Sequence, residues 1–207
     1  MSTIPTLIRN KLNFYLIKKK IKGRNNHIEK DDSCIIRNTH ILVQGNNNTI
    51  IFGNNCNISG LRILIVGDNN LIEFEKKVTI NASTYQPTVI NAVGGKFIKI
   101  GEGALLSNNI EIHTSDYHGI YNLQGNRVNP DKNIVIGKHV WICLGAKILK
   151  GTEIADGCVV GGGAVLSGTY PLPNSILVGN PAKVVREHIF WNEQRKDYWE
   201  VPDALKK

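Results

Sequence analysis

The 207-residue sequence lacks several features that would assign it at once to a familiar class of protein. It has no uninterrupted apolar run of the ~18–20 residues that a membrane-spanning helix requires. No CxxC pair or Cys/His cluster has the spacing of a zinc site, and the Gly-x-Ser-x-Gly sequence of serine hydrolases does not occur. A single Met with 20 Gly is a poor composition for a helical bundle and suits short strands joined by tight turns.

Acidic residues are absent from the first 28 positions, and this absence explains the net charge of +8. The segment holds seven of the 25 Lys and Arg residues, so the remaining 179 residues carry 18 basic against 17 acidic side chains. The net positive charge is therefore concentrated in one terminal segment, and the rest of the protein is nearly neutral. Because no nucleic-acid recognition motif accompanies it, we expect no nucleic-acid partner.

This segment, residues 1–28, is predicted to form a basic amphipathic helix. Thr3 can cap it, Pro5 suits its first turn and Gly23 can end it, while apolar residues recur along it at helical spacing. Arg, Asn and Lys interrupt those apolar residues, so a signal peptide is not expected. The helix would pack on its own domain or on a neighbouring subunit, or it would dock on a membrane surface or a polyanion.

A six-residue repeat runs through the second half of the chain. Five consecutive hexads open with an aliphatic residue, at Ile136, Ile142, Ile148, Ile154 and Val160. Their fifth places hold small or β-branched residues, at Val140, Ala146, Thr152, Cys158 and Ala164. The same phase appears from Ile100, and looser copies begin at Phe52, Ile58, Val66, Ile72 and Val78.

A short strand followed by a turn explains this period, since a helix cannot keep every sixth residue on one face. Each six-residue side would point one aliphatic residue inward, and Gly and Asn would supply the unusual backbone angles of the corners. Three sides make a triangular coil, and stacked coils bury an aliphatic column. Cys143 and Cys158 fall within this register, so we expect reduced, buried cysteines rather than disulfides. Chemistry is then left to loops, edges and subunit interfaces.

The repeat resembles that of the hexapeptide-repeat acyltransferases, and within them the galactoside, maltose, serine and capsular-polysaccharide O-acetyltransferases. The resemblance implies an all-β solenoid, a left-handed parallel β-helix; the spacing alone does not give the hand. The expected organisation is the N-terminal helix (1–28), a β-helix domain (29–186) with a protruding loop (113–133), and a short C-terminal helix or arm (187–207).

The hexads stop after Ile112 and resume in phase at Ile136, and the polar segment between them is long for a loop in a compact domain. It begins His113-Thr-Ser-Asp-Tyr-His118, and Val-Trp141-Ile follows. This pattern resembles the family's catalytic segment, in which a loop His precedes a Trp on the resumed coil. His118 precedes Trp141 by 23 residues and matches better than His113, which precedes it by 28. The resemblance implies His118 as general base, with His113 as the alternative.

A base is needed because a sugar hydroxyl is a poor nucleophile at neutral pH. A neutral imidazole could take its proton during attack on the thioester of acetyl-CoA, and then protonate the departing thiolate. Asp116 or a backbone carbonyl could orient the ring. Backbone N–H groups or the Trp141 indole could stabilise the oxyanion, although Trp141 could equally be a packing residue that bounds the acceptor pocket.

The sequence Gly179-Asn-Pro-Ala-Lys183-x-x-Arg186 closely resembles the segment that ends the β-helix in this family and binds coenzyme A. The resemblance implies acetyl-CoA as the donor, bound by Leu144, Gly162, Ser167, Gly168, Lys183 and Arg186. The two cations would face the phosphates, unless they are merely solvated. Cys143 stands where the family usually has Gly, and could narrow the donor tunnel or place a thiol there. Because it directly follows an inward Ile of the repeat, it is predicted to face outward.

The resemblance thus implies an acetyl-CoA-dependent O-acetyltransferase without a metal. Its expected acceptor is a carbohydrate, such as the sialic-acid capsule of a bacterial surface. It implies a homotrimer with sites between subunits, in the cytoplasm, and the basic segment could bring the protein to the inner face of the membrane. Three alternatives stay open: N-acetylation of an amino sugar, a structural or regulatory β-helix subunit without activity, and a membrane-surface adaptor.

Overall fold

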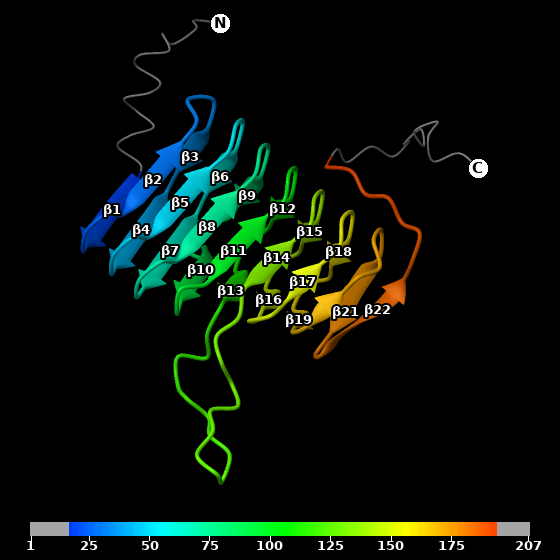
Figure 1. Ribbon diagram of the computed structural model, residues 1–207. Coiled ribbons are helices and arrows are strands. Elements are labelled where there is room, and N and C mark those ends of the chain that lie inside the picture. Colours follow the sequence, from blue (N-terminus) through cyan, green and yellow to red (C-terminus); the bar gives the residue numbers. More distant parts are fainter. Residues whose placement is uncertain (1–16, 194–207) are drawn as a thin grey trace, which may run out of the picture.

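The computed structural model describes residues 17–193; positions 1–16 and 194–207 lie outside the described residues. The described chain winds into a solenoid whose coils stack into three sheets (Figure 1). No helix occurs within residues 17–193, so none there is long and apolar enough to cross a membrane. The all-β solenoid is as predicted, and its left hand stays a prediction of the family resemblance.

In each sheet the parallel strands stack in chain order, one from each successive coil. Sheet A contains β1 (Ile17–Lys22), β4 (Thr39–Gln44), β7 (Leu61–Val66), β10 (Thr88–Val93), β13 (Glu111–His113), β16 (Lys147–Ile148) and β19 (Val165–Leu166). Sheet B contains β2 (His27–Lys30), β5 (Thr49–Phe52), β8 (Leu71–Phe74), β11 (Phe97–Ile100), β14 (Ile134–Ile136), β17 (Glu153–Ile154) and β20 (Thr169–Tyr170). Sheet C contains β3 (Ile35–Arg37), β6 (Asn57–Ser59), β9 (Thr79–Asn81), β12 (Leu105–Leu106), β15 (Trp141–Ile142), β18 (Val159–Val160), β21 (Ile176–Gly179) and the antiparallel β22 (Ala182–Arg186).

Burial confirms the hexad pattern. The opening and fifth-place residues are all at most 3% exposed, namely Ile136, Val140, Ile142, Ala146, Ile148, Thr152, Ile154, Cys158, Val160 and Ala164. Each fully buried aliphatic side chain is worth about 1.5–3 kcal/mol relative to exposure. The repeat therefore supplies the continuous core that holds successive coils together.

All four cysteines are free in the structure. Cys34, Cys56 and Cys158 are buried, as predicted, and burial raises the pKa of the Cys56 thiol to about 12. Cys143 is only half-buried, so the general expectation of buried cysteines fails there, while its predicted outward position is confirmed. It follows the inward Ile142 and therefore lies on the outer side of the coil, where partial burial still raises its thiol pKa.

The coils change length along the rod. Near the N-terminus, residues 22 apart lie on successive coils, such as Arg24 and Asn46, whereas beyond the loop the step is 18, as between Lys138 and Asp156. The shorter coil is three hexads. The coil that carries the loop has a step of 36, twice the short coil. The loop is thus an insertion that leaves the stacking of the coils intact.

An asparagine ladder joins the longer coils. Asn26 Oδ1 accepts hydrogen bonds from the Asn48 backbone N and Nδ2, both at 3.0 Å, and Asn48 Oδ1 accepts the same pair from Asn70 at 2.9 and 3.0 Å. The Asn70 Oδ1 in turn accepts from the Lys96 backbone N. Because Asn48 and Asn70 are at most 2% exposed, these bonds satisfy polar groups that would otherwise be buried without partners.

The predicted N-terminal helix is wrong where the structure describes it, since residues 17–22 form β1 in parallel register with β4. The described part of the chain is therefore already coiled at Ile17, ahead of the expected boundary at residue 29. Backbone pairing with an open sheet edge outweighs the helical spacing of the apolar residues. The rest of the predicted helix lies outside the described residues.

The predicted C-terminal helix is also unsupported: residues 187–193 form an irregular arm without helix, and the remainder lies outside the described residues. The arm is held because Trp191 packs on His139 and is only 7% exposed.

Candidate active site

The loop between β13 and β14 projects well away from the rod (Figure 1). Its first residue is pinned to the end of β10, because the buried Thr114 Oγ1 accepts from the Val93 N (2.8 Å) and donates to the Val93 O (3.1 Å). The Lys132 backbone N donates to the Thr114 O at 3.0 Å, which closes the base of the loop. The loop is therefore anchored at the point where it leaves the coil.

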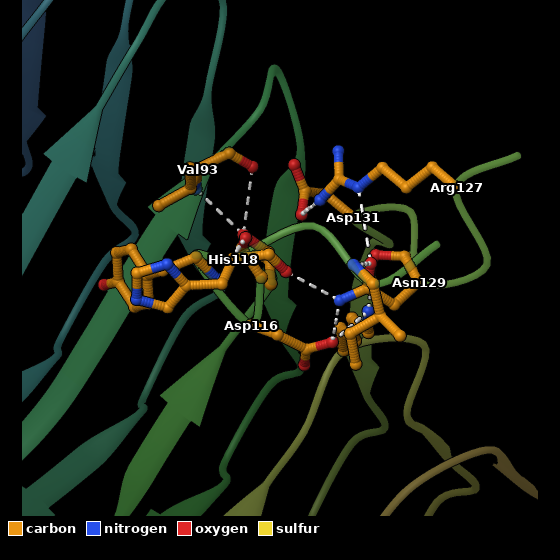
Figure 2. Close-up of polar contacts among 11 residues, drawn as sticks. Val93, Asp116, His118, Arg127, Asn129 and Asp131 are labelled. Carbon is orange, nitrogen blue, oxygen red and sulfur yellow. Dashed lines mark hydrogen bonds and ion pairs between the residues drawn. The ribbon is translucent and has the colours of Figure 1, made fainter. Parts of the chain in front are cut away.

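Asn129 organises the interior of this loop (Figure 2). It is 8% exposed, and its Nδ2 donates to the Asp116 carboxylate and to the His118 carbonyl, both at 2.8 Å. Its Oδ1 accepts from the Ile120 backbone N at 2.7 Å and, more weakly, from Arg127 Nε at 3.4 Å. One buried amide thus ties together both branches of the loop.

Lys150 connects this loop to the following coil. Its Nζ forms an ion pair with Asp116 and donates to the Asn129 carbonyl at 2.8 Å. The hydrogen bond from Lys150 is the main reason that the pKa of Asp116 lies below its usual range, with the Asn129 amide adding to it. Asp116 therefore stays ionised at neutral pH, and its recorded contacts run to Lys150 and Asn129 rather than to an imidazole.

His118 is fixed through its backbone while its ring is exposed. Its N donates to the Asp116 carbonyl at 2.8 Å, and its O accepts from Asn129. Within residues 17–193 its imidazole makes no recorded hydrogen bond or ion pair. A positioned, uncommitted imidazole is what a general base needs before its substrate arrives.

His113 lies in a different environment at the base of the loop. Its ring is half-buried, its Nδ1 accepts from Asn91 Nδ2 at 3.0 Å, and its Nε2 lies 3.5 Å from the Glu111 carboxylate. Burial lowers the pKa of His113, and the Glu111 carboxylate opposes that shift. The Tyr117 ring packs edge-on against it with centroids 6.5 Å apart. His113 is thus engaged in packing where His118 is open.

Trp141 lies on β15 in sheet C, with its side chain 37% exposed. Its ring is 5.8 Å from that of Trp191, so the C-terminal arm reaches it. His118 follows sheet A, and the structure records no contact between the two predicted catalytic residues within one chain.

The predicted donor-site residues fall into two groups. Leu144 and Gly162 stack at the corner between sheets C and A, where a Cβ on Gly162 would lie 3.3 Å from the Leu144 carbonyl. Cys143 lies beside them. Leu144 is 52% exposed, so this corner is open to a ligand. A glycine there lets an extended molecule approach the backbone closely.

The second group lies at the C-terminal end of the solenoid. Ser167 and Gly168 occupy the exposed turn after β19, and Gly168 has a φ of 96°. Lys183 and Arg186 are exposed on β22, opposite Val178 and Ile176 of β21. Within the part of the chain that the structure describes, neither cation is recorded in an ion pair. Both remain available to an anionic ligand.

Asn129 and Lys150 are the residues that sequence reasoning missed. An asparagine before Pro130 indicates only a turn, and the position of Lys150 in its hexad indicates only an exposed side chain. Only the returning branch of the loop shows that both contact Asp116. Residues 17–193 contain no cluster of three His, Cys, Asp or Glu side chains placed to hold a metal.

Known proteins resemble this arrangement, although no family model matches the chain. A polysialic acid O-acetyltransferase of Neisseria meningitidis is 34% identical over 98 residues, which are 47% of this chain and 46% of that protein. A galactoside O-acetyltransferase of Escherichia coli (strain K12) is 27% identical over 122 residues, 59% of this chain and 58% of that protein. The chain spans about half the length of the curated relatives it matches.

The matches to solved structures cover more of the chain than the matches to curated relatives do. The polysialic acid O-acetyltransferase OatWY matches with a TM-score of 0.69 and 31% identity, over 86% of this chain and 93% of that one. The polySia-specific acetyltransferase NeuO matches in fold with a TM-score of 0.64 and 23% identity, over 90% and 86%. The chain shares 31% identity with OatWY over 93% of that protein, and it has buried hexads and a loop inserted between coils. It therefore belongs to the hexapeptide-repeat acetyltransferases, the family that includes the polysialic acid O-acetyltransferases.

Proposed function

We propose that this protein transfers an acetyl group from acetyl-CoA to a hydroxyl of polysialic acid or a related acidic surface polysaccharide. The observation that carries the proposal is the exposed imidazole of His118 on a loop fixed by the buried Asn129. Membership of an acetyltransferase family supports acyl transfer, and the likeness to OatWY supports the acceptor class. The proposal places the enzyme in the cytoplasm, where acetyl-CoA is available, at the inner face of the membrane.

His118 acts as the general base in this proposal. Its neutral imidazole takes the proton of the acceptor hydroxyl as that oxygen attacks the thioester carbonyl carbon of acetyl-CoA. The carbon–sulfur bond then breaks, and the imidazolium returns its proton to the departing thiolate. The products are the acetyl ester and free coenzyme A, and the imidazole is again neutral. No covalent enzyme intermediate is required.

The developing oxyanion needs a hydrogen-bond donor that is already in place. We assign this role to the Trp141 indole N–H, supplied by a second copy of the chain. The placement of His118 after sheet A and Trp141 in sheet C supports a site shared between subunits, and the family resemblance supports a homotrimer. Loss of either residue would then be complemented in a mixed oligomer.

The donor would lie along the open corner of Leu144 and Gly162, with its phosphates near Lys183 and Arg186. The exposure of all four residues and the absence of a side chain at Gly162 support this path. Cys143 sits at the same corner, and its raised thiol pKa keeps it protonated near neutral pH. It therefore shapes the path without competing as a thiolate nucleophile.

The test is thiol release from acetyl-CoA with polysialic acid, neutral oligosaccharides and amino sugars as acceptors. We expect acceptor-dependent release with polysialic acid, lowered roughly 10²- to 10⁴-fold by His118→Ala. His27→Ala, which removes an exposed histidine from β2, is the matched control and should leave the rate unchanged. Release that survives His118→Ala and is lost in His113→Ala would move the base to His113. Failure of every acceptor, together with no binding of coenzyme A, would leave a non-catalytic β-helix.

A further inference from the structure

The outward side chains of sheet A form a column that is basic at its N-terminal end. The parallel register places Lys18 of β1 beside His40 of β4, and His40 beside Arg62 of β7. Two residues further along the strand, on the same face, Lys20 lies beside Leu42. Because neighbouring strands are ~4.8 Å apart, cationic side chains repeat at close intervals along the rod.

This face is hollowed into a groove of about 520 Å³. Its Lys and Arg lining consists of Lys18, Lys19, Lys20 and Arg62, and its apolar floor includes Leu42 and Leu64. No Asp or Glu lines the groove within the described residues. The groove therefore combines permanent positive charge with apolar surface, a combination suited to the carboxylates and C–H faces of an acidic sugar chain.

The groove leads toward the catalytic loop. Its lining continues through Val89 to Asn91 of β10, and Asn91 pairs in register with His113 of β13, from which the loop departs. Figure 1 shows β1, β4, β7, β10 and β13 following one another along one side of the rod toward that loop. Four strand steps of ~4.8 Å give a path of about 19 Å.

Asn91 marks the end of this path with an unsatisfied polar group. Its side chain is 7% exposed, its Nδ2 is bound to His113, and its Oδ1 has no hydrogen-bond partner within the described residues. Buried polar atoms in native proteins usually have a partner. A ligand hydroxyl at the end of the groove would supply one after a small side-chain adjustment.

We propose that this groove binds the acidic glycan as a polymer, holding sugars remote from the one that is acetylated. The inference rests on the proposed function, which it deepens by placing the remote sugars of the acceptor on the outward face of sheet A. Lys18 and Arg62 pair with successive carboxylates, and the apolar floor contacts the sugar rings. Long acceptors then gain affinity that short ones cannot.

Two other occupants are less consistent with the face. A lipid surface is flat, whereas this face is concave and continues to the loop base. In a two-fold contact, a second copy would bring Lys18, Lys20 and Arg62 against their own counterparts, and in the proposed trimer the neighbour contributes Trp141 of sheet C instead. Like charges in contact are destabilising. The acidic glycan satisfies both the shape and the charge.

The test uses the full chain with Lys18→Gln and Arg62→Gln combined. Binding of a long fluorescent polysialic acid is measured without acetyl-CoA, and KM is measured with long polymer and with disialic acid. We expect the polymer dissociation constant and polymer KM to rise about five- to tenfold, with kcat/KM for disialic acid changed less than about twofold. The matched control combines Lys30→Gln and Lys138→Gln, which removes two exposed charges from other faces and should change neither quantity.

The proposal would be overturned if the groove variant and the control variant changed polymer binding equally. It would also be overturned if the groove variant lost as much kcat/KM with disialic acid as with long polymer. So would loss of binding to phosphatidylglycerol vesicles with polymer binding intact, since the occupant would then be lipid. A change in oligomeric mass by light scattering would make the face a subunit contact. Polymer binding is measured without acetyl-CoA, so it tests the groove independently of catalysis. If the polymer binds but is never acetylated, only the proposed function is refuted.

Discussion

Trp191 and His139 hold each other by two hydrogen bonds and a ring stack. The Trp191 Nε1 donates to the His139 carbonyl at 2.8 Å, and the His139 Nε2 donates to the Trp191 carbonyl at 3.1 Å. Their rings are parallel within 6° and 4.0 Å apart. His139 is two residues before Trp141 and has a φ of 51°. This pair therefore locks the C-terminal arm onto the corner that positions Trp141.

Trp191→Ala should release the arm. Both hydrogen bonds can be lost with the stack, because the backbone of an undocked arm no longer faces His139. Trp191→Phe should keep much of the stacking and lose one donor, at a cost of about 1 kcal/mol. We expect faster proteolysis between residues 187 and 193 and a more red-shifted emission of the two remaining tryptophans in the Ala variant than in the Phe variant. His188→Asn, an exposed change on the same arm, should leave both unchanged.

Asn129→Ala should lower kcat without weakening donor binding. The variant leaves the His118 carbonyl and the Asp116 carboxylate without their shared donor, so the loop no longer fixes the His118 backbone. We expect kcat to fall about 10- to 100-fold with an unchanged KM for acetyl-CoA, because misplacement of a base affects the chemical step. Equal changes in both constants would indicate a purely structural role.

Two companions make this test specific. Asn126→Ala removes an exposed asparagine from the same loop, and no hydrogen bond of its side chain is recorded. It should retain full activity. Lys150→Met should reproduce part of the Asn129 defect, whereas Lys150→Arg keeps a cation against Asp116 and should restore part of the rate.

The second half of the chain was largely predictable because its interior repeats with a fixed period. Ile136 to Ala164 lie in the core as the hexads require, and the interruption after Ile112 is a protruding loop. The first half was less predictable, since its 22-residue coils do not preserve that period. β1 was missed because its sequence Ile-Lys-Lys-Lys-Ile-Lys follows apolar residues at helical spacing and holds no clear hexad. Local spacing cannot report a pairing with residues 22 positions away.

Acid should destabilise the base of the loop through His113. Burial holds the folded-state pKa of His113 below the value near 6.5 of an unfolded chain. The unfolded state therefore binds more protons between these two values. The stability from the neutral ring is fully present above about pH 6.5 and is lost as pH falls through the lower folded-state pKa.

The measurement is the unfolding midpoint of wild type and His113→Gln between pH 7.5 and 5, in steps. Wild type should lose more stability than the variant as pH falls, because glutamine does not titrate. The Glu111 carboxylate raises the pKa of the ring and the Lys147 ammonium lowers it, but burial is the largest effect and the net shift of the pKa is downward. Parallel curves for the two proteins would show that His113 titrates alike in both states.

Asn48→Ala should destabilise the N-terminal coils more than most surface changes. Asn48 is 2% exposed; its Oδ1 accepts from the backbone N and Nδ2 of Asn70, and its own Nδ2 donates to Asn26 and to the Gly67 carbonyl. Alanine would leave several buried polar groups without partners, at about 1–3 kcal/mol each. We expect a total loss of roughly 2–4 kcal/mol, allowing for partial rehydration.

Thermal unfolding of Asn48→Ala and Asn57→Ala would check this expectation. Asn57 is exposed on β6, and no side-chain hydrogen bond is recorded for it, so its removal should stay within about 0.5 kcal/mol. The contrast separates the ladder from any general effect of asparagine. Similar midpoints for both variants would mean that the coils are held by their aliphatic column alone. A large loss confined to Asn48 would show that buried amide bonds between coils also support the longer coils, which have a weaker hexad pattern.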